Sequence, residues 1–179
     1  ASYAKQVCRK LIDQDLDIRW WSILYPKHVD RKLVAYMARA GCEQVSIGFE
    51  SGSERILKNM NKRFTLEEVQ QISEVLSEQG IKRMGFLLLG GPGETRESVE
   101  ESLLFADSLQ LDNVKITVGV RIYPHTPLAK KAIEEGMIAS HHELLFPQFY
   151  LAKGLGDWLP ETLKNLAATR PHWVIPDDG

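Results

Sequence analysis

The feature that most constrains the fold is a regular alternation of extended apolar segments with amphipathic helical segments. Four segments have the composition of strands, and they span residues 16–24, 44–50, 82–89 and 113–123. Each is followed by a helical pattern, and successive strands begin roughly 28 to 38 residues apart. This spacing is typical of βα units in a parallel sheet, which is either closed as a barrel or open and doubly wound.

Residues that begin and end helices separate the strands. Asp30 and Thr95 stand where a helix begins, and Thr65 with Glu68 forms a capping box. Gly80 stands just past the end of the helix that this box begins. Further helices are predicted over residues 3–13, 127–135 and 160–168.

The faces of the strands favour a barrel. Strands of a doubly wound sheet lie under helices on both faces and are apolar throughout. Residues 44–50 and 113–123 instead alternate apolar with polar side chains, and 16–24 does so in part. A solvated edge would explain one such strand but hardly three, whereas a barrel lumen explains them all. We therefore predict an α/β fold, a partial TIM-type (βα) barrel with about four parallel strands and a C-terminal extension.

Composition excludes several classes of protein. The 179 residues carry a formal net charge of -2, which gives no electrostatic sign of nucleic-acid binding. The longest apolar run is about residues 84–89, far short of the ~20 residues that a membrane helix needs. We expect a cytoplasmic protein with no membrane segment and no nucleic-acid partner.

The two cysteines, Cys8 and Cys42, lie far apart in the sequence. A thiolate zinc or iron–sulfur site needs three or four ligands. This chain therefore cannot form such a site alone, and we predict no metal ligand in it. Both cysteines are interpreted as small buried side chains.

The most informative stretch is Leu89-Gly90-Gly91-Pro92-Gly93-Glu94-Thr95, at the end of a strand. Glycines here can expose backbone N–H and C=O groups to an adenine edge, a carboxylate or a phosphate. The stretch has neither the lysine of a P-loop nor the third glycine of a dinucleotide fingerprint. The alternative is a tight turn that simply requires glycine.

Three charged residues lie on the polar strand faces. Glu50 ends its strand at the carboxyl end, where ligand contacts of barrels occur, although it could equally be solvated. Arg19 and Arg121 lie on the equivalent faces of their strands. A lumen arginine must hold an anionic ligand or pair with a carboxylate, for which Glu50 and Asp17 are available.

Three segments carry a resemblance to a known family. Residues 45–54 (VSIGFESGSE) and 85–95 (GFLLLGGPGET) resemble the fourth-strand and fifth-strand motifs of radical S-adenosylmethionine (SAM) enzymes. Residues 121–129 (RIYPHTPLA) and 134–138 resemble the sixth-strand segment, with His125 where the family usually has glycine. The nearest branch is associated with a cobalamin domain and includes methyltransferases and anaerobic porphyrin-ester cyclases.

The resemblance implies that residues 1–138 are strands three to six of a radical SAM partial barrel and that residues 139–179 are a wrapping extension. The family's cluster-binding cysteines belong to a loop after its first strand, which this chain lacks. The implied enzyme is a longer protein that uses SAM and a 4Fe–4S cluster, with cobalamin in some members. The chain alone is expected to be inactive, and its expected partner is the missing N-terminal strands.

The resemblance also implies roles for individual residues. The cofactor contacts are Glu50 and Ser51 at the ribose or methionine end, Leu89, Gly90 and Gly91 at the adenine or sulfonium side, and Ile122 and Tyr123 beside the adenine. Arg19 and Arg121 would face the SAM carboxylate or the substrate, a small molecule or a tetrapyrrole-like compound. No residue is identified as a proton donor or nucleophile.

Two other functions stay open. One is a non-enzymatic βα-barrel-like module for ligand binding or interaction. The other is a metal-free barrel enzyme that uses Glu50 and the arginines for acid–base chemistry. Under the radical SAM interpretation, the missing strands leave an exposed sheet edge, which invites self-association of the chain.

Overall fold

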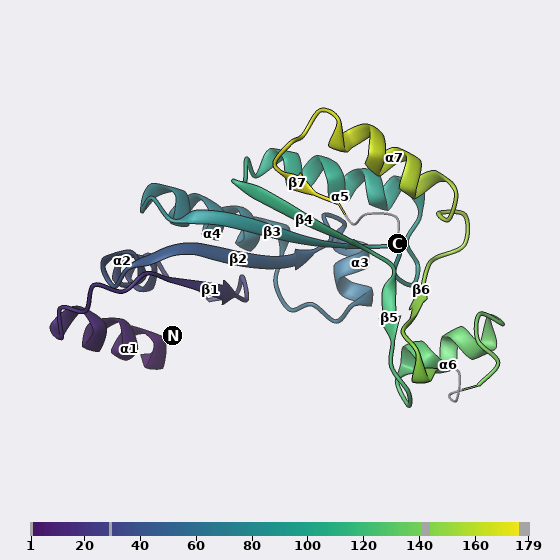
Figure 1. Cartoon of the computed structure of the whole chain (residues 1–179), viewed down its shortest axis with the longest axis horizontal. Helices are drawn as coiled ribbons and strands as arrows, with labels where there is room; N and C mark the ends of the chain where they lie inside the picture. The colour runs from purple at the N-terminus through teal and green to yellow at the C-terminus, as the bar shows by residue number, and fades with distance from the viewer. Residues whose placement is uncertain (1, 29, 141–143, 176–179) are drawn as a thin grey trace.

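The main sheet has five parallel strands that follow one another in the order β1-β2-β3-β4-β7 (Figure 1). The computed structural model describes residues 2–28, 30–140 and 144–175. The strands are β1 (Trp20–Leu24), β2 (Cys42–Glu50), β3 (Lys82–Leu89), β4 (Asn113–Val118) and β7 (Trp173–Val174). A doubly wound sheet reverses its strand order at a switch point, and this sheet does not. The partial barrel is confirmed, with β7 as an additional short strand.

Three of the helices begin directly after the capping residues that the sequence predicts. They are α1 (Ser2–Asp13), α2 (Arg31–Arg39), α3 (Glu54–Asn59), α4 (Leu66–Glu78), α5 (Arg96–Ser108), α6 (Pro127–Glu134) and α7 (Trp158–Ala167). The side chain of Asp30 caps α2, and capping boxes at Thr65 and Thr95 begin α4 and α5. None of the helices in the described part of the chain has the length and apolar character needed to cross a membrane.

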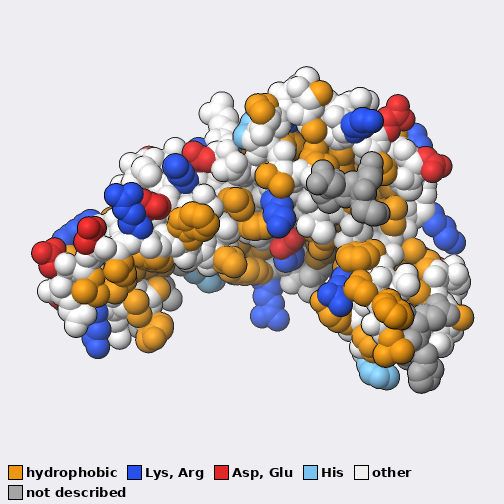
Figure 2. All heavy atoms as spheres, in the orientation of Figure 1, with side chains coloured by type: hydrophobic (Ala, Val, Ile, Leu, Met, Phe, Trp, Pro, Cys, Tyr) orange, Lys and Arg blue, Asp and Glu red, His pale blue; other side chains and the backbone are white. Residues whose placement is uncertain are grey.

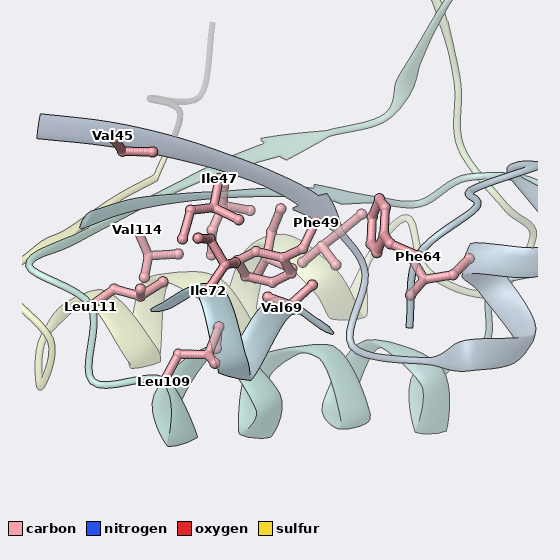
Figure 3. Packing of buried hydrophobic residues seen from close by; sticks show 14 of the residues in the cluster. Val45, Ile47, Phe49, Phe64, Val69, Ile72, Leu109, Leu111 and Val114 are labelled. Atoms are coloured by element: carbon pink, nitrogen blue, oxygen red, sulfur yellow. The ribbon is translucent and has the colours of Figure 1, made fainter. Parts of the chain in front are cut away.

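The alternation along the strands separates a buried face from an open one. Val45, Ile47 and Phe49 of β2 are completely buried. Figure 3 shows Ile47 and Phe49 pointing towards Val69 and Ile72 of α4. Each buried side chain of this size contributes roughly 1.5–3 kcal/mol to folding. The polar side chains therefore lie on the opposite face, which we call the open face.

The first strand is shorter than the sequence predicts. Residues 16–19 do not pair with β2, because the chain crosses closely over Gly41 at this point. A Cβ atom on Gly41 would lie 2.0 Å from the carbonyl oxygen of Ile18. Gly41 also has φ +86, so only glycine fits here without strain.

The predicted strand over residues 113–123 divides at Gly119, which has φ +78. After Gly119 the chain leaves the main sheet, and β5 (Val120–Ile122) pairs antiparallel with β6 (Gln148–Tyr150). We call β5, α6 and β6 the β5–β6 lobe. Figure 2 shows hydrophobic side chains gathered on this lobe, where Tyr123 and Phe149 are exposed. The figure also shows a hollow between the lobe and the end of the molecule formed by α1 and β1.

The C-terminal extension is more than a wrapping segment with one helix. It supplies β6 to the lobe and β7 to the main sheet, and α7 lies between them in sequence. Leu155, Leu159 and Leu163 are buried in the common core. The extension therefore packs with the barrel strands, and a domain boundary at residue 138 stays a prediction.

Candidate functional site

The backbone at the end of β2 is unusual. Glu50 has φ +65, in the left-handed region, and the register between β2 and β3 shifts between Gly48 and Glu50. A residue with a Cβ atom loses roughly 1–2 kcal/mol in this conformation. Such strain is concentrated at functional sites, so the outlier marks this strand end as a candidate site.

The left-handed turn places the Glu50 carboxylate over the open face. A Cβ atom on Gly48 would lie 3.1 Å from Oε1 of Glu50, so the carboxylate lies above the bare backbone of Gly48. The same oxygen lies 3.4 Å from Nζ of Lys62. Both side chains are only about a quarter exposed, at 24% for Glu50 and 25% for Lys62. A partly shielded pair of opposite charges therefore stands at the carboxyl end of the sheet.

Lys62 comes from the loop between α3 and α4, which the structure holds in place. The backbone N–H of Arg63 donates to the Tyr25 hydroxyl at 2.8 Å, and the Lys27 ammonium donates to the Arg63 carbonyl. The Phe64 ring meets the Tyr25 ring edge-on, with centroids 5.1 Å apart. These contacts fix the loop against the end of β1, so the Lys62 ammonium has a defined position.

The open face beside Glu50 is largely apolar. Phe86 of β3 is the register partner of Gly48, and Leu88 follows it on the same face. Both are half-buried, and Lys115 and Thr117 of β4 are their polar neighbours. The site thus combines an apolar floor with the carboxylate of Glu50, the ammonium group of Lys62 and, on the neighbouring strand, that of Lys115.

Ser51 does not face this site. Its side chain is completely buried, and its hydroxyl lies 2.9 Å from the hydroxyl of Ser102 on α5. Ser102 accepts a hydrogen bond from the N–H of Gly52 and donates to the carbonyl of Ser98. These serines join the end of β2 to α5, and a contact of Ser51 with the cofactor stays a prediction.

The glycine-rich turn after β3 is closed by its own glutamate. The N–H groups of Gly90 and Gly91 both donate to Oε2 of Glu94, at 2.7 Å for Gly91. The carbonyl of Leu89 accepts from the N–H of Gly119 at 2.7 Å. The N–H groups of Gly90 and Gly91, which the sequence predicted to contact a ligand, therefore bind a side chain of the turn itself. This agrees with the alternative prediction, a tight turn that requires glycine.

Glu94 is itself buried, with an exposed fraction of 4%. Its Oε1 atom has no hydrogen-bond partner among the described residues. Burial raises the pKa of the Glu94 carboxyl above its ordinary value, and the hydrogen bonds from Gly91 and Gly90 offset this in part. The turn therefore depends on a carboxylate in a poorly solvated position.

The expected position of Arg19 is wrong. Arg19 precedes β1, and its guanidinium pairs with Glu43 at 2.8 Å, near the start of β2. This is the amino end of the parallel strands, whereas Glu50 lies at the carboxyl end. The error arises from the strand boundary, because β1 begins one residue after Arg19.

The three residues predicted after β4 are placed on the β5–β6 lobe. Arg121 lies over the ring of Tyr123, with its Cζ atom 4.9 Å from the ring centroid, and both are exposed. No carboxylate of the described residues pairs with Arg121. Ile122 is only 3% exposed and belongs to the core, and its expected place beside an adenine ring stays a prediction.

His125 stands where the family resemblance expects glycine. It has φ +61, so the left-handed backbone is retained without a glycine. The turn at this point is therefore preserved despite the substitution, at a conformational cost that glycine would avoid.

Neither cysteine takes part in a metal site. Cys8 on α1 and Cys42 at the start of β2 are buried, and burial raises the pKa of Cys42 to about 11. Within the part of the chain that the structure describes, no group of three or more His, Cys, Asp or Glu residues could hold a metal ion. A 4Fe–4S cluster does not fit the thiols of this chain.

Two residues of the site were missed from sequence. Lys62 lies in a loop with no motif of its own, and only its place just before the capping box at Thr65 could have drawn attention to it. Glu94 follows Gly90 by four positions, and a carboxylate at that spacing after paired glycines can return to their N–H groups.

Comparison with known proteins decides the family. A model described as the radical SAM superfamily matches residues 5–106, more than half of the chain. The chain belongs to the radical SAM superfamily. The matched range contains Glu50, Lys62 and the glycine-rich turn, but not the β5–β6 lobe or the C-terminal extension.

Individual known proteins resemble the chain over half of its length or more. An uncharacterized methyltransferase of Pyrococcus horikoshii is 30% identical over 75% of this chain and 29% of its own length. Anaerobic magnesium-protoporphyrin IX monomethyl ester cyclase of Rubrivivax gelatinosus is 29% identical over 56% of this chain and 19% of its own length.

A solved structure has the same fold. The radical SAM methyltransferase TsrM of Kitasatospora setae, with cobalamin and a 4Fe–4S cluster bound, superposes with a TM-score of 0.81. It is 21% identical, and the match covers 99% of this chain and 43% of TsrM. The chain thus spans less than half the length of each of these three proteins.

Proposed function

We propose that this chain forms the part of a radical SAM barrel that binds the ribose and methionine end of SAM. The observation that carries the proposal is the strained Glu50, whose carboxylate lies over Gly48 and beside Lys62. A strained residue persists only where the surrounding structure holds it, and here the strain brings a carboxylate onto the open face beside Lys62. A role in ligand binding explains why a glutamate occupies this position.

The residues present fit SAM. The absence of a side chain at Gly48 lets the Glu50 carboxylate lie close over the strand, where a Cβ atom would meet its Oε1 at 3.1 Å. Phe86 and Leu88 supply an apolar surface for the adenosine part. The Glu50 carboxylate can accept hydrogen bonds from ribose hydroxyl or amino groups, and the Lys62 ammonium can pair with the SAM carboxylate.

The longer protein would be an enzyme of the radical SAM type. When SAM and a reduced 4Fe–4S cluster are bound, they supply a 5′-deoxyadenosyl radical that abstracts hydrogen from the substrate. The cluster does not fit Cys8 and Cys42, so its ligands would lie elsewhere in the longer protein. The residues of this chain bind and orient SAM, and the apolar surface excludes water from it.

The reaction class is methyl transfer or oxidative cyclisation. The methyltransferase and cyclase names of the relatives support these two classes, and the fold shared with TsrM supports cobalamin in the longer protein. The substrate would be a small molecule or a tetrapyrrole-like compound. Arg121 would contact an anionic group of it, because its guanidinium is exposed beside Tyr123 without a carboxylate partner in the described chain.

The exposed edge of β1 supports a proposal about partners. On its second side β1 has no strand partner among the described residues, and Trp21 and Ile23 are exposed. Further strands of the same protein would pair here, and the chain alone would self-associate at this edge. A cytoplasmic location of the longer protein also stays a proposal, which fractionation of its source cells would test.

The deciding experiment is anaerobic iron–sulfide reconstitution of the longer protein, followed by reduction in the presence of SAM. The expected result is 5′-deoxyadenosine, with none formed by this chain alone. A protein that holds a cluster and binds SAM but releases no 5′-deoxyadenosine would overturn the proposal and favour a non-enzymatic binding module. Turnover of a substrate by this chain without a cluster would favour the metal-free barrel enzyme.

A further inference from the structure

The C-terminal extension passes directly over the glycine-rich turn. The N–H of Ala152 donates to the carbonyl of Gly90 at 2.9 Å. A Cβ atom on Gly90 would lie 2.3 Å from Cδ1 of Leu151, so the Leu151 side chain occupies the space above this glycine. The turn and the extension are in direct contact in the fold, although Ala152 follows Gly90 by 62 residues in the sequence.

The same segment also covers the end of β4. A Cβ atom on Gly119 would lie 3.2 Å from Cβ of Phe149 and 3.3 Å from the carbonyl oxygen of Tyr150. Gly119 in turn donates its N–H to the carbonyl of Leu89, immediately before the turn. The neighbouring strands β3 and β4 are therefore each followed by a glycine, Gly90 and Gly119, at the place where residues 149–152 lie against the chain.

This segment is anchored on both sides. Near its start, the buried Tyr150 donates its hydroxyl proton to Oε2 of Glu135 at 2.9 Å. After it, Leu155 and Leu159 are buried in the core, and the Arg170 guanidinium holds Asp107 of α5 through its Nε at 2.8 Å. These contacts hold residues 149–152 in place against the glycine-rich turn.

We infer that Leu151 is a positioning residue for the glycine-rich turn, and that through this contact the C-terminal extension sets the affinity of the site for SAM. The inference rests on the proposed function, and it extends the SAM site from the end of β2 to the glycine-rich turn that follows the neighbouring strand β3. It goes beyond the family relationship, because Leu151 lies outside residues 5–106 that define it. The buried Glu94 holds the same glycines from within the turn, since its carboxylate accepts hydrogen bonds from the N–H groups of Gly90 and Gly91.

The test compares Leu151→Ala with Leu166→Ala in the full-length protein. Both leucines are half-buried and belong to the extension, but Leu166 lies on α7, outside the segment that contacts the turn. Amide hydrogen exchange of residues 90–95 and the dissociation constant for SAM are measured for each variant. We expect Leu151→Ala to accelerate exchange of this segment and to weaken SAM binding about tenfold, and Leu151→Met to restore both.

Leu166→Ala is expected to lower the melting temperature while leaving exchange of residues 90–95 and SAM affinity unchanged. Equal effects of the two alanine variants on both readouts would overturn the inference. The exchange measurement needs no cofactor, so it tests the contact even if the wild-type protein binds no SAM. Absence of SAM binding by the wild type would instead contradict the proposed function.

A second pair of variants tests the contact itself. Gly90→Ala introduces the Cβ atom that meets Leu151, whereas Gly80→Ala introduces one at φ +69 with no atom within 4 Å. Gly80→Ala therefore reports backbone strain alone, and Gly90→Ala should lower the melting temperature further. The excess should disappear when Gly90→Ala is combined with Leu151→Ala. An excess that persists in the double variant would show that Leu151 does not fill this space.

Discussion

The Nζ atom of Lys62 lies 3.4 Å from Oε1 of Glu50, at the carboxyl end of β2. This distance is longer than the ~2.7–2.9 Å of a charge-assisted hydrogen bond. The two groups therefore attract each other while each keeps capacity for further hydrogen bonds. The left-handed backbone at Glu50 and the loop that carries Lys62 bring the two groups together. The loop is held by the hydrogen bond from the Arg63 N–H to the Tyr25 hydroxyl, which is a contact between segments distant in sequence.

Gly48→Ala tests whether the position of the Glu50 carboxylate matters. The new Cβ atom would lie 3.1 Å from Oε1, so the carboxylate must move. Loss of one charge-assisted hydrogen bond, worth about 1.5 kcal/mol, should weaken SAM binding about tenfold in the full-length protein. The free energy of unfolding should change by less than about 1 kcal/mol, because Gly48 meets no other atom that close.

Ser46→Ala is the matched control for Gly48→Ala, since Ser46 lies two residues earlier on the same face of β2. It should leave SAM affinity unchanged. Unaltered affinity in Gly48→Ala, measured by equilibrium dialysis, would mean that Glu50 does not contact the ligand.

The buried Glu94 predicts a specific pH dependence of stability. Burial raises its folded-state pKa above the unfolded value of about 4.3, so in the window between the two values the folded state binds more protons. This carboxyl therefore makes the free energy of unfolding fall as pH rises through that window. Glu94→Gln keeps an acceptor for the Gly90 and Gly91 N–H groups but cannot titrate, so it should remove this pH dependence of the free energy of unfolding. Denaturant titrations at several pH values across the window would measure the difference.

Glu94→Ala is the companion variant. It leaves two N–H groups without their acceptor and should lower the free energy of unfolding by about 1–3 kcal/mol at neutral pH. A pH profile of Glu94→Gln that parallels the wild type would show that Glu94 does not titrate as its burial implies.

The two arginines should behave differently. Arg121→Ala removes an exposed guanidinium at the β5–β6 lobe and should weaken SAM or substrate binding more than it lowers the melting temperature. Arg19→Ala removes an exposed ion pair with Glu43 at the amino end of the sheet, worth less than about 1 kcal/mol, and should leave binding unchanged. A lowered melting temperature with wild-type affinity in Arg121→Ala would make Arg121 a structural residue.

The edge of β1 predicts association of the isolated chain. Trp21 and Ile23 are 71% and 79% exposed, and β1 carries no charged residue that would discourage pairing. Ile23→Lys should shift the chain towards monomer in sedimentation velocity at high concentration. A wild-type chain that stays monomeric under the same conditions would contradict this prediction.

The sequence predicted those parts of the fold that depend on neighbouring residues. The caps at Asp30, Thr65 and Thr95 and the alternating face of β2 are local patterns, and each appears where it was expected. The break at Gly119 was missed, because the alternation of apolar and polar residues that predicts a strand continues without change on both sides of this glycine.

The site was predictable only in part. Glu50 was identified from its place at a strand end, but its left-handed backbone could not be anticipated for a glutamate. Glu94 and Leu151 act on the glycine-rich turn through contacts made in three dimensions, and one of them comes from a segment expected only to wrap the barrel. Arg19 was misplaced by a single residue at a strand boundary, which is the least determined feature of a sequence pattern.

The most direct test of the account is the dissociation constant for SAM in the full-length protein with Glu50→Gln, compared with Glu43→Gln at the other end of the same strand. Both changes neutralise one carboxylate of β2, but only Glu50 lies beside Gly48 and Lys62. The account predicts about tenfold weaker binding for Glu50→Gln and wild-type binding for Glu43→Gln. Wild-type affinity in Glu50→Gln, or an equal loss in both variants, would contradict it.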